Sequence, residues 1–328
     1  MTWQLFDGSP QQWDEIVVRL GATTPFQLSS WSQFRESFGW RSFRLSDGGN
    51  NQAIQMLVKS IGAVRVAWAP GSPLGEVSAA DLAELALNVR RILGGAVVYI
   101  RLGDHRPKDP GRLERLREAG WSACSSSIGG AETLIRTLDQ ETGSIHDLYS
   151  SNWSRNLRRG MQRGVTANVW DAPEPDQVAL LHREVEELKG SFGAEWRGDS
   201  AAVKRLLDSF GNKIVMVKAE DAEGAMLAIR AAVVIGTNGF DFLAATSSAG
   251  RKNYASNVAL DALLSALAAR GVSRYDFGGV DRVLNKGVFD FKHGAGGIDH
   301  TYNGEFETAV PRLVKSLVSK LVSFRLSA

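Results

Sequence analysis

Hydrophobic and polar positions follow one order of elements twice along the chain. Short apolar runs bounded by turn residues predict strands, whereas apolar positions three and four residues apart predict helices. In the first half of the chain, the pattern predicts three strands, a helix and a fourth strand. Their expected ranges are 41–46, 52–60, 62–70, 78–93 and 96–102.

The second half repeats this order of three strands, a helix and a strand. The expected ranges are 213–220, 224–236, 239–247, 254–270 and 273–279. Residues 144–210 between the two copies are mostly helical in pattern, with a proline-containing break at 171–176. The repeat predicts an α/β (α+β) fold with two tandem domains, 1–145 and 146–328, each a mixed sheet flanked by helices. One continuous mixed sheet with added elements is the alternative.

Composition adds limits to this picture. A chain of 328 residues with 44% hydrophobic residues is long enough for two domains. The net charge of +2 means that any nucleic-acid contact must come from a local patch rather than from bulk charge. Cys124 is the one cysteine, which fits a reducing cytoplasm, and we expect a buried structural thiol rather than a nucleophile there. No apolar run is long enough to predict a membrane-spanning helix.

One predicted helix carries unmixed positive charge. Arg155, Arg159 and Arg163 are spaced by four and share a face, with Arg158 beside them. No acidic residue occurs from 148 to 170. Guanidinium groups suit phosphate, so this face is a candidate contact for RNA, a nucleotide or a lipid-linked precursor. A solvated helix face is the alternative.

A glycine-rich stretch near the C-terminus is the strongest candidate for chemistry. The last predicted strand ends in Gly278 and Gly279, and Lys292 follows Phe291 in a short aromatic and glycine-rich segment. Glycines let a backbone approach a ligand closely, and a lysine can place positive charge where a carbonyl oxygen becomes negative. Asp276 at the strand end could orient a donor or accept a proton. A structural lysine is the alternative.

Two further segments have weaker signals. In 25–40, Trp31 belongs to an apolar helix face, while Gln27 and Arg35 could face a cleft; a helix packed on a sheet is the alternative. The Pro/Gly turn at 69–76 precedes a helix, where free backbone N–H groups can hold an anion, although a plain turn is favoured.

The C-terminal segment 312–326 predicts a basic amphipathic helix. It carries four cations and no acid, and Pro311 suits its first turn. Such a helix can lie on an anionic membrane surface or dock on the core of the protein, and docking is favoured. Its apolar stripe consists of Leu313, Leu317, Leu321 and Phe324.

The order of these motifs resembles the Fem family (FemABX-like) of peptidoglycan interpeptide-bridge aminoacyltransferases, which have a tandem GNAT-like architecture. The resemblance rests on "FQLSSWSQFRESFGW", "VAWAPGSPLGE", "SNWSRNLRRGMQRGV", and "YDFGG" followed by "FDFKHGAGG". It implies transfer of an amino acid from aminoacyl-tRNA to an amine of a peptidoglycan precursor or a similar acceptor. It implies no metal and no cofactor beyond the tRNA-borne co-substrate.

Carried over by position, the resemblance implies that Lys292 holds and polarises the reacting carbonyl or its oxyanion. Arg35 and Arg197 would hold the diphosphate of the precursor. We therefore expect Lys292 and Asp276 to be catalytic. The expected substrate-binding residues are Gln27, Trp31, Arg35, Arg155, Asn156, Arg158, Arg197, Tyr254, Gly278, Gly279 and Phe291.

Two other function classes stay open. Segment 247–256 occupies the place of a CoA pyrophosphate loop but lacks its glycine pattern, so a CoA-dependent N-acyltransferase of a polysaccharide or lipid pathway is the second hypothesis. A non-catalytic module that binds nucleic acid or membrane is the third, and it leaves the lysine segment 291–297 without a purpose. The helical hairpin that some family members insert has no room in 171–210.

Overall fold

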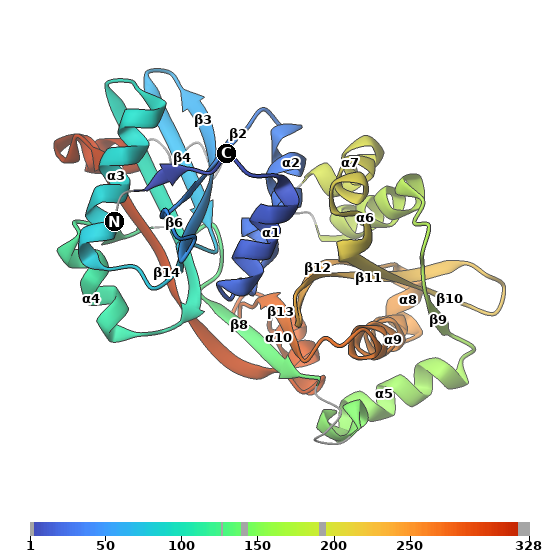
Figure 1. Cartoon of the computed structure of the whole chain (residues 1–328). Coiled ribbons are helices and arrows are strands. Elements are labelled where there is room, and N and C mark those ends of the chain that lie inside the picture. The colour runs from blue at the N-terminus through green and yellow to red at the C-terminus, as the bar shows by residue number, and fades with distance from the viewer. Residues whose placement is uncertain (1–2, 126, 139–143, 190–194, 321–328) are drawn as a thin grey trace. The chain divides into compact units, whose positions relative to one another are not determined.

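The computed structural model describes residues 3–125, 127–138, 144–189 and 195–320 (Figure 1). The chain forms two compact units, one of residues 1–132 together with 300–328, and one of residues 133–299. This division differs from the predicted boundary after residue 145. It differs because β8 (Glu132–Thr137) pairs with a strand of the second unit and the last strand of the chain pairs with a strand of the first unit. Local pattern does not encode such long-range pairing.

The sheet of the first unit has the order β1-β2-β3-β4-β6-β14. Neighbouring strands are antiparallel except β4 and β6, which run parallel. Two short strands, β5 (Leu74–Gly75) and β7 (Ser122–Ala123), pair with β3 and β14. The bounds are β1 Gln4–Leu5, β2 Arg41–Ser46, β3 Gln52–Ile61, β4 Val64–Pro70, β6 Val97–Pro107 and β14 Ile298–Val310.

Helices cover this sheet. They are α1 (Pro10–Arg19), α2 (Ser29–Glu36), α3 (Ala79–Leu93) and α4 (Pro110–Glu118), with 3-10 turns η1 (Pro25–Gln27) and η6 (Arg312–Val314). The start of α3 is a capping box in which the Ser78 hydroxyl and the Asp81 carboxylate each accept a backbone N–H of the other. Its apolar face, with Leu82, Leu85 and Val89, is buried in the core of the unit.

The sheet of the second unit repeats the arrangement, with the order β9-β10-β11-β12-β13-β8. Neighbours are again antiparallel except one parallel pair, β12 and β13. Each unit thus has three antiparallel strands, a helix and a strand parallel to the third, as the repeat in the sequence predicted. The bounds are β8 Glu132–Thr137, β9 Thr166–Val169, β10 Ile214–Glu220, β11 Met226–Ile235, β12 Asn238–Thr246 and β13 Arg274–Gly279.

The second unit contains most of the helices that concern function. They are α5 (Ser151–Gln162), α6 (Pro175–Lys189), α7 (Ser200–Phe210), α8 (Ser248–Lys252), α9 (Ala255–Ala269) and α10 (Lys286–Gly294), with 3-10 turns η3 (Ile145–Leu148), η4 (Glu195–Gly198) and η5 (Gly211–Lys213). Helix α5 lies next to α9 (Figure 1). The two approach closely at Gly160, where an added Cβ would come within 2.7 Å of the Val258 side chain.

Two elements differ from the sequence prediction. The segment around Lys292 is the helix α10, where the sequence pattern predicted no helix, and its exposed first turn has a Lys286–Asp290 pair at i and i+4. The mostly helical segment 144–210 also contains the short strand β9, which extends the sheet beside β10.

The described part of the C-terminal segment docks on the first unit. Arg312 donates to the backbone at the end of α4, over 2.9 Å, and Val318 is buried. The predicted apolar stripe is wrong as the docking face, since Leu313 and Leu317 are 98% and 74% exposed. The remainder of the predicted amphipathic segment, 321–326, lies outside the described residues. Within the part of the chain that the structure describes, no helix is long and apolar enough to cross a membrane.

Candidate active site

A cavity of about 590 Å³ in the second unit is lined by residues of the two strands β11 and β12 and of the four helices α6, α8, α9 and α10. Strands β11 and β12 supply its floor residues Arg230 and Asp241, α8 supplies Arg251, and α10 supplies Phe291 and Lys292. The predicted catalytic lysine therefore lies in a concave site with polar groups of both signs. Such a site is the usual place for a small-molecule reaction.

Lys292 is buried, with 8% of its surface exposed. Its ammonium donates to the backbone carbonyls of Phe277 (2.6 Å) and Gly279 (3.2 Å). An ammonium has three donors, so one N–H is left for a ligand in the cavity. Burial lowers the pKa of the Lys292 ammonium, and the nearby Asp241 carboxylate acts in the opposite direction.

Arg230 and Asp241 form an ion pair at the floor of this cavity. The Arg230 Nη1 donates to the Asp241 carboxylate over 3.0 Å, and the two side chains are 9% and 8% exposed. The guanidinium also lies 5.1 Å from the centre of the Phe291 ring. This pair was not predicted from the sequence. Its signal was a charged residue inside the apolar run of β11, since a buried charge requires a partner.

Asp276 has a different place from the one predicted. It is fully buried, does not line the cavity, and accepts from the Thr133 hydroxyl (2.6 Å) and the Gly278 N–H (2.8 Å). Gly278 has a φ of +70°, a conformation that favours glycine. Asp276 therefore holds the strand end whose carbonyls bind Lys292. Of the two roles expected from the sequence, orienting a donor and accepting a proton, the geometry favours the first.

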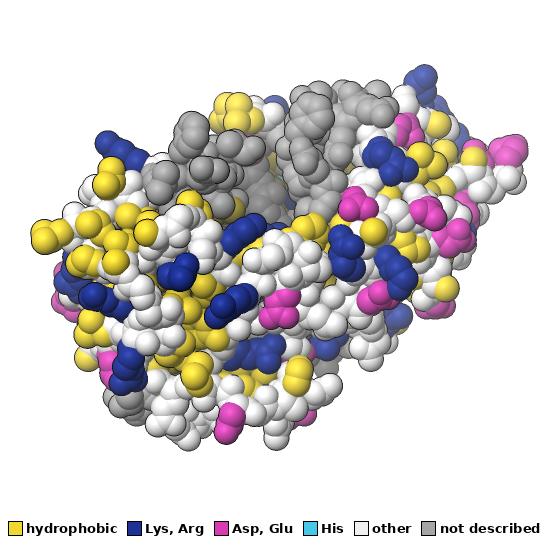
Figure 2. All heavy atoms as spheres, turned by 90° about the horizontal axis from the view of Figure 1, so that it is seen from above, with side chains coloured by type: hydrophobic (Ala, Val, Ile, Leu, Met, Phe, Trp, Pro, Cys, Tyr) yellow, Lys and Arg dark blue, Asp and Glu magenta, His cyan; other side chains and the backbone are white. Residues whose placement is uncertain are grey.

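The predicted arginine helix is α5. Its arginines Arg155, Arg158, Arg159 and Arg163 are exposed, and no described carboxylate lies within ion-pair distance of any of them. Asn156 is half-buried on the same helix. Basic side chains on the face drawn in Figure 2 are instead scattered among acidic, polar and hydrophobic ones. The concentration of unpaired positive charge on α5 is therefore a local feature.

Tyr254 connects α5 with the start of α9. The Arg163 guanidinium lies over its ring, 5.1 Å from the centre, and the Arg159 Nη1 lies 3.5 Å from its hydroxyl. Tyr254 has a φ of +58°, an uncommon conformation for a residue with a side chain. The predicted binding residue thus contacts the arginine face rather than the cavity.

Gln27 and Trp31 are structural residues of the first unit. The fully buried Gln27 amide donates to the carbonyls of Gln55 (3.1 Å) and Pro70 (2.8 Å) and accepts from the Gln55 N–H (2.6 Å). It therefore joins β3 to β4 and does not face a cleft. Trp31 is buried and packs against the rings of Phe26 and Phe34.

Arg35 is half-buried among aromatic rings of the first unit. Its guanidinium lies between 5.4 and 5.9 Å from the ring centres of Trp31, Phe38 and Trp40. No ion pair joins it to a carboxylate of the described residues, and burial lowers its pKa. Arg197, its predicted companion, lies half-buried in η4 of the second unit.

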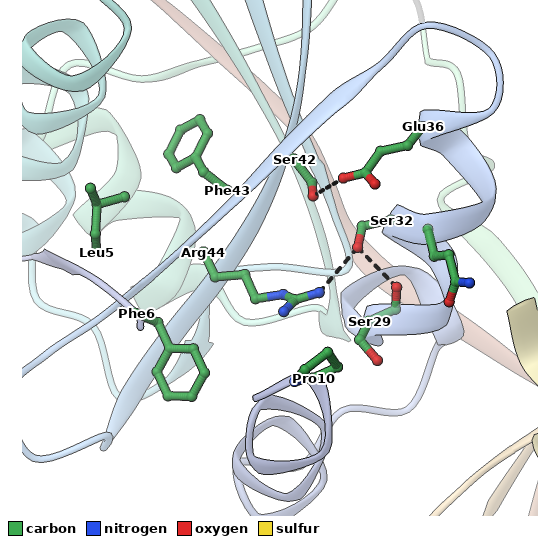
Figure 3. A pocket seen from close by; sticks show the side chains of 10 residues that line it. Leu5, Phe6, Pro10, Ser29, Ser32, Glu36, Ser42, Phe43 and Arg44 are labelled. Carbon is green, nitrogen blue, oxygen red and sulfur yellow. Dashed lines mark hydrogen bonds between the residues drawn. The ribbon is translucent and has the colours of Figure 1, made fainter. Parts of the chain in front are cut away.

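A second cavity of about 560 Å³ lies in the first unit beside α2 and β2 (Figure 3). The Arg44 guanidinium donates to the Ser32 hydroxyl (3.2 Å), and the Ser42 hydroxyl donates to Glu36 (2.5 Å). No residue of the predicted site lines this cavity. Its polar groups bond one another, so the cavity offers less to a ligand than the site around Lys292.

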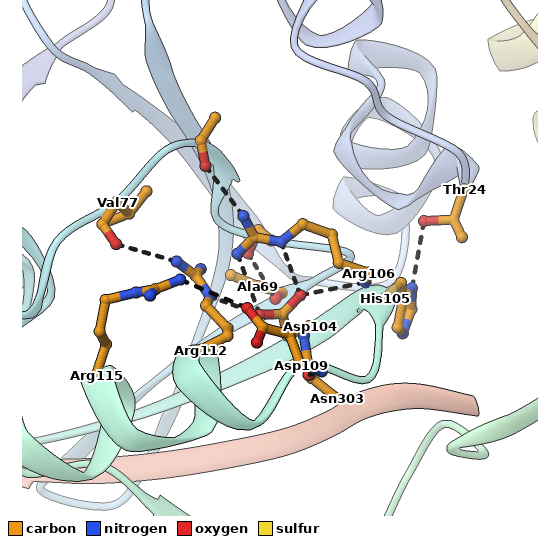
Figure 4. Close-up of polar contacts among 12 residues, drawn as sticks. Thr24, Ala69, Val77, Asp104, His105, Arg106, Asp109, Arg112, Arg115 and Asn303 are labelled. Atoms are coloured by element: carbon orange, nitrogen blue, oxygen red, sulfur yellow. Dashed lines mark hydrogen bonds and ion pairs between the residues drawn. The ribbon is translucent and has the colours of Figure 1, made fainter.

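The turn at 69–76 is held by a buried charge cluster (Figure 4). Asp104 accepts from Arg106 (3.1 Å) and Arg112 (2.9 Å), and Arg106 also donates to the Gly75 carbonyl (3.0 Å). Burial would raise the pKa of Asp104, but the two arginines hold it below its usual range. Arg106 binds the turn through the Gly75 carbonyl oxygen, which favours a plain turn over an anion site.

Cys124 does not have the properties of a nucleophile. Burial is the main cause that raises the pKa of its thiol, to about 12. Because the thiolate is the nucleophilic form, this supports the structural role expected from the sequence.

Comparison with known protein families gives a match for the C-terminal part of the chain. Residues 197–321 match the model of the FemAB family. The matched segment, 197–321, is called the FemAB region below. The FemAB region includes Lys292 and the four other named residues of its cavity. None of the curated proteins compared with the chain matches it.

Solved structures share the fold of the FemAB region and of the rest of the chain. The crystal structure of FemX has a TM-score of 0.83 at 15% identity, covering 96% of this chain and all of that one. L-PGS from Bacillus licheniformis has a TM-score of 0.55 at 14% identity, with 97% and 98% covered. A tandem GNAT protein from the clavulanic acid biosynthesis pathway has a TM-score of 0.55 at 12% identity, with 94% and 98% covered.

These likenesses confirm the predicted fold class, a tandem GNAT-like architecture with mixed sheets flanked by helices. The FemAB region and the fold together support an acyltransferase. At identities of 12–15%, these structures show a shared fold and do not identify the acyl donor or the acceptor.

Proposed function

We propose that the protein moves an amino acid from aminoacyl-tRNA to an amine of a peptidoglycan precursor or a similar acceptor. The FemAB region supports a peptidoglycan-related aminoacyltransferase in general. The observation that carries the proposal is the buried Lys292 ammonium, held at a cavity by two carbonyls with one donor left for a ligand.

The reaction is aminolysis of an ester. The acceptor nitrogen attacks the ester carbonyl, a C–N bond forms, and the carbonyl oxygen becomes an oxyanion. The C–O bond to the terminal ribose then breaks, and the ribose oxygen takes a proton. Lys292 places its charge at the oxyanion. An ester is already activated, so alignment and charge suffice without ATP or a covalent intermediate.

The attacking amine must lose its proton. Among the described residues that line the cavity, Asp241 is the carboxylate, and we assign it the role of proton acceptor that the sequence suggested for Asp276. Its ion pair with Arg230 gives this buried carboxylate a counter-charge. Arg35 and Arg197 stay candidates for a phosphate contact, each within its own unit, and the aromatic surroundings of Arg35 support this for Arg35. An aminoacyl-tRNA donor is also consistent with the cytoplasmic location expected for the protein.

The CoA-dependent alternative is less well supported. In the segment 247–256, the Gly250 N–H already donates to the Ser247 hydroxyl over 2.9 Å. A Cβ at Gly250 would lie 2.3 Å from the Leu227 carbonyl oxygen, so close packing accounts for this glycine. Neither feature resembles a loop with free N–H groups for a pyrophosphate.

A donor assay tests the proposal. The purified protein is incubated with labelled aminoacyl-tRNAs, or separately with labelled acyl-CoAs, together with an extract of peptidoglycan precursors. We expect label to reach an acceptor only from aminoacyl-tRNA, and RNase treatment of the donor's RNA body to reduce the transfer. Transfer from acyl-CoA alone would replace the proposal by the CoA-dependent alternative.

The pH dependence of the chemical step reports on Lys292. As a stabilising cation it must be protonated, so transfer falls as pH rises through its pKa, which burial lowers below that of ordinary lysine. A single-turnover pH profile at saturating substrates should show this alkaline decline. In the K292R variant, whose guanidinium stays charged, residual activity should persist to higher pH. An identical alkaline limb in both proteins would contradict the role of Lys292.

A further inference from the structure

We propose that a basic face formed by α5 and α8 binds the phosphate backbone of the RNA donor. The α5–α8 face consists of Arg155, Arg158, Arg159, Arg163, Arg251 and Lys252. This inference rests on the proposed function, because it takes aminoacyl-tRNA as the donor and places the RNA beside the cavity of the same unit.

The charge of the face is uncompensated. All six side chains are exposed, and none forms an ion pair with a described carboxylate. The two helices are joined at one point, where the Arg163 guanidinium donates to the Lys252 carbonyl and stacks on Tyr254. The arginine row on α5 spans about 12 Å along the helix, enough for more than one phosphate. Arginine forks suit phosphate oxygens.

The same helix is unsuited to a membrane surface. An interfacial helix inserts its apolar side between lipids. The apolar side of α5 carries Trp153 and Leu157, which are 3% and 8% exposed and belong to the core of the unit. Lipid insertion would require this core to open, whereas a polyanion needs only the exposed arginines. The structure therefore favours RNA over lipid.

The face leads to the reaction site. Arg251, at its α8 end, also lines the cavity that contains Lys292. An RNA strand whose phosphates lie along the face would thus bring its esterified end to Arg251 and into the cavity. Tyr254, at the start of α9, contacts Arg159 and Arg163 and so helps to hold the arginine side of the face in place.

Binding of deacylated tRNA to the full chain tests the face. Fluorescence anisotropy over a salt series should show R158A/R159A binding about tenfold or more weaker than wild type, with a log–log salt slope reduced by about 0.7–0.9 per lost phosphate contact. The R90A/R117A variant removes two exposed arginines of the first unit and should bind as wild type does. Vesicles with anionic lipid should not bind.

Three results would overturn the inference. They are equal weakening in both double variants, no RNA binding by the wild-type protein, and binding to anionic vesicles that R158A/R159A abolishes while RNA binding is unchanged. Circular dichroism of both variants shows whether they are folded, and neither exchange touches the core.

Transfer assays separate this inference from the proposed function. R158A/R159A should raise the KM for aminoacyl-tRNA while transfer from a short aminoacylated dinucleotide stays at the wild-type rate. Wild-type transfer with an unchanged KM in the variant would refute the face and leave the proposed function intact. RNA binding that depends on the face, without transfer from any aminoacyl donor, would refute the proposed function alone.

Discussion

The K292M variant is expected to fold and to lose aminoacyl transfer by a factor of about 10²–10³ or more. Methionine has nearly the shape of the lysine stem but no charge, so the oxyanion loses its stabilising partner. The carbonyls of Phe277 and Gly279 lose a donor as well, which costs about 1–3 kcal/mol of stability. That cost is small enough for a unit with an extensive buried core to remain folded.

Single-turnover kinetics and a thermal melt of the same preparation measure both effects. K286M is the matched control, since Lys286 lies on the same helix but is exposed and pairs with Asp290. The control should transfer at the wild-type rate. Full activity of K292M would show that Lys292 serves only to fix the end of β13.

The D104N variant is expected to destabilise the first unit by about 3–5 kcal/mol. Asparagine keeps the shape of the side chain but leaves Arg112, which is 2% exposed, and Arg106 without a counter-charge. Because the pKa of Asp104 is lowered in the folded state, its contribution is present above the pKa of an unfolded aspartate. It is lost as pH falls through the folded pKa.

Chemical unfolding at several pH values tests this expectation. Wild type should lose stability on acidification more steeply than D104N, so that the difference between the two shrinks at low pH. D109N removes a carboxylate that is 55% exposed and paired with Arg115 over 3.7 Å, and should cost under about 1 kcal/mol. A similarly small loss of stability in D104N would mean that solvent, and not the Asp104 carboxylate, stabilises the charges of the two arginines.

Much of the fold could be predicted because its signals are local. Strand β2 occupies the predicted range 41–46, and α3 begins one residue after the predicted start because Ser78 is its cap. The order of three strands, a helix and a strand in each unit could be predicted for the same reason. The hydrophobic period and the turn residues that define these elements lie within short stretches of sequence. The division of the chain into its two units could not be predicted from the sequence, because it depends on pairing between strands that are far apart in the chain.

The site was predicted in part. Lys292 lies in a cavity as expected, although on a helix, since the glycines at 287 and 294 concealed the helical pattern. Asp276 and Gln27 are polar residues in suggestive places whose hydrogen bonds are all made within the protein, which only coordinates reveal. The Asp241 partner of Arg230 comes from the neighbouring strand, across a bulge that alters the register.

The return of β14 to β6 has a consequence for the growing polypeptide. Residues 133–299 leave the ribosome before residues 300–310 can pair with β6. The second unit is thus complete while the first still lacks a strand, which reverses the usual N-terminal-first order of co-translational folding. Until β14 arrives, one edge of β6 has unpaired backbone groups, and this interval is when the nascent protein is most exposed to pairing with a foreign strand.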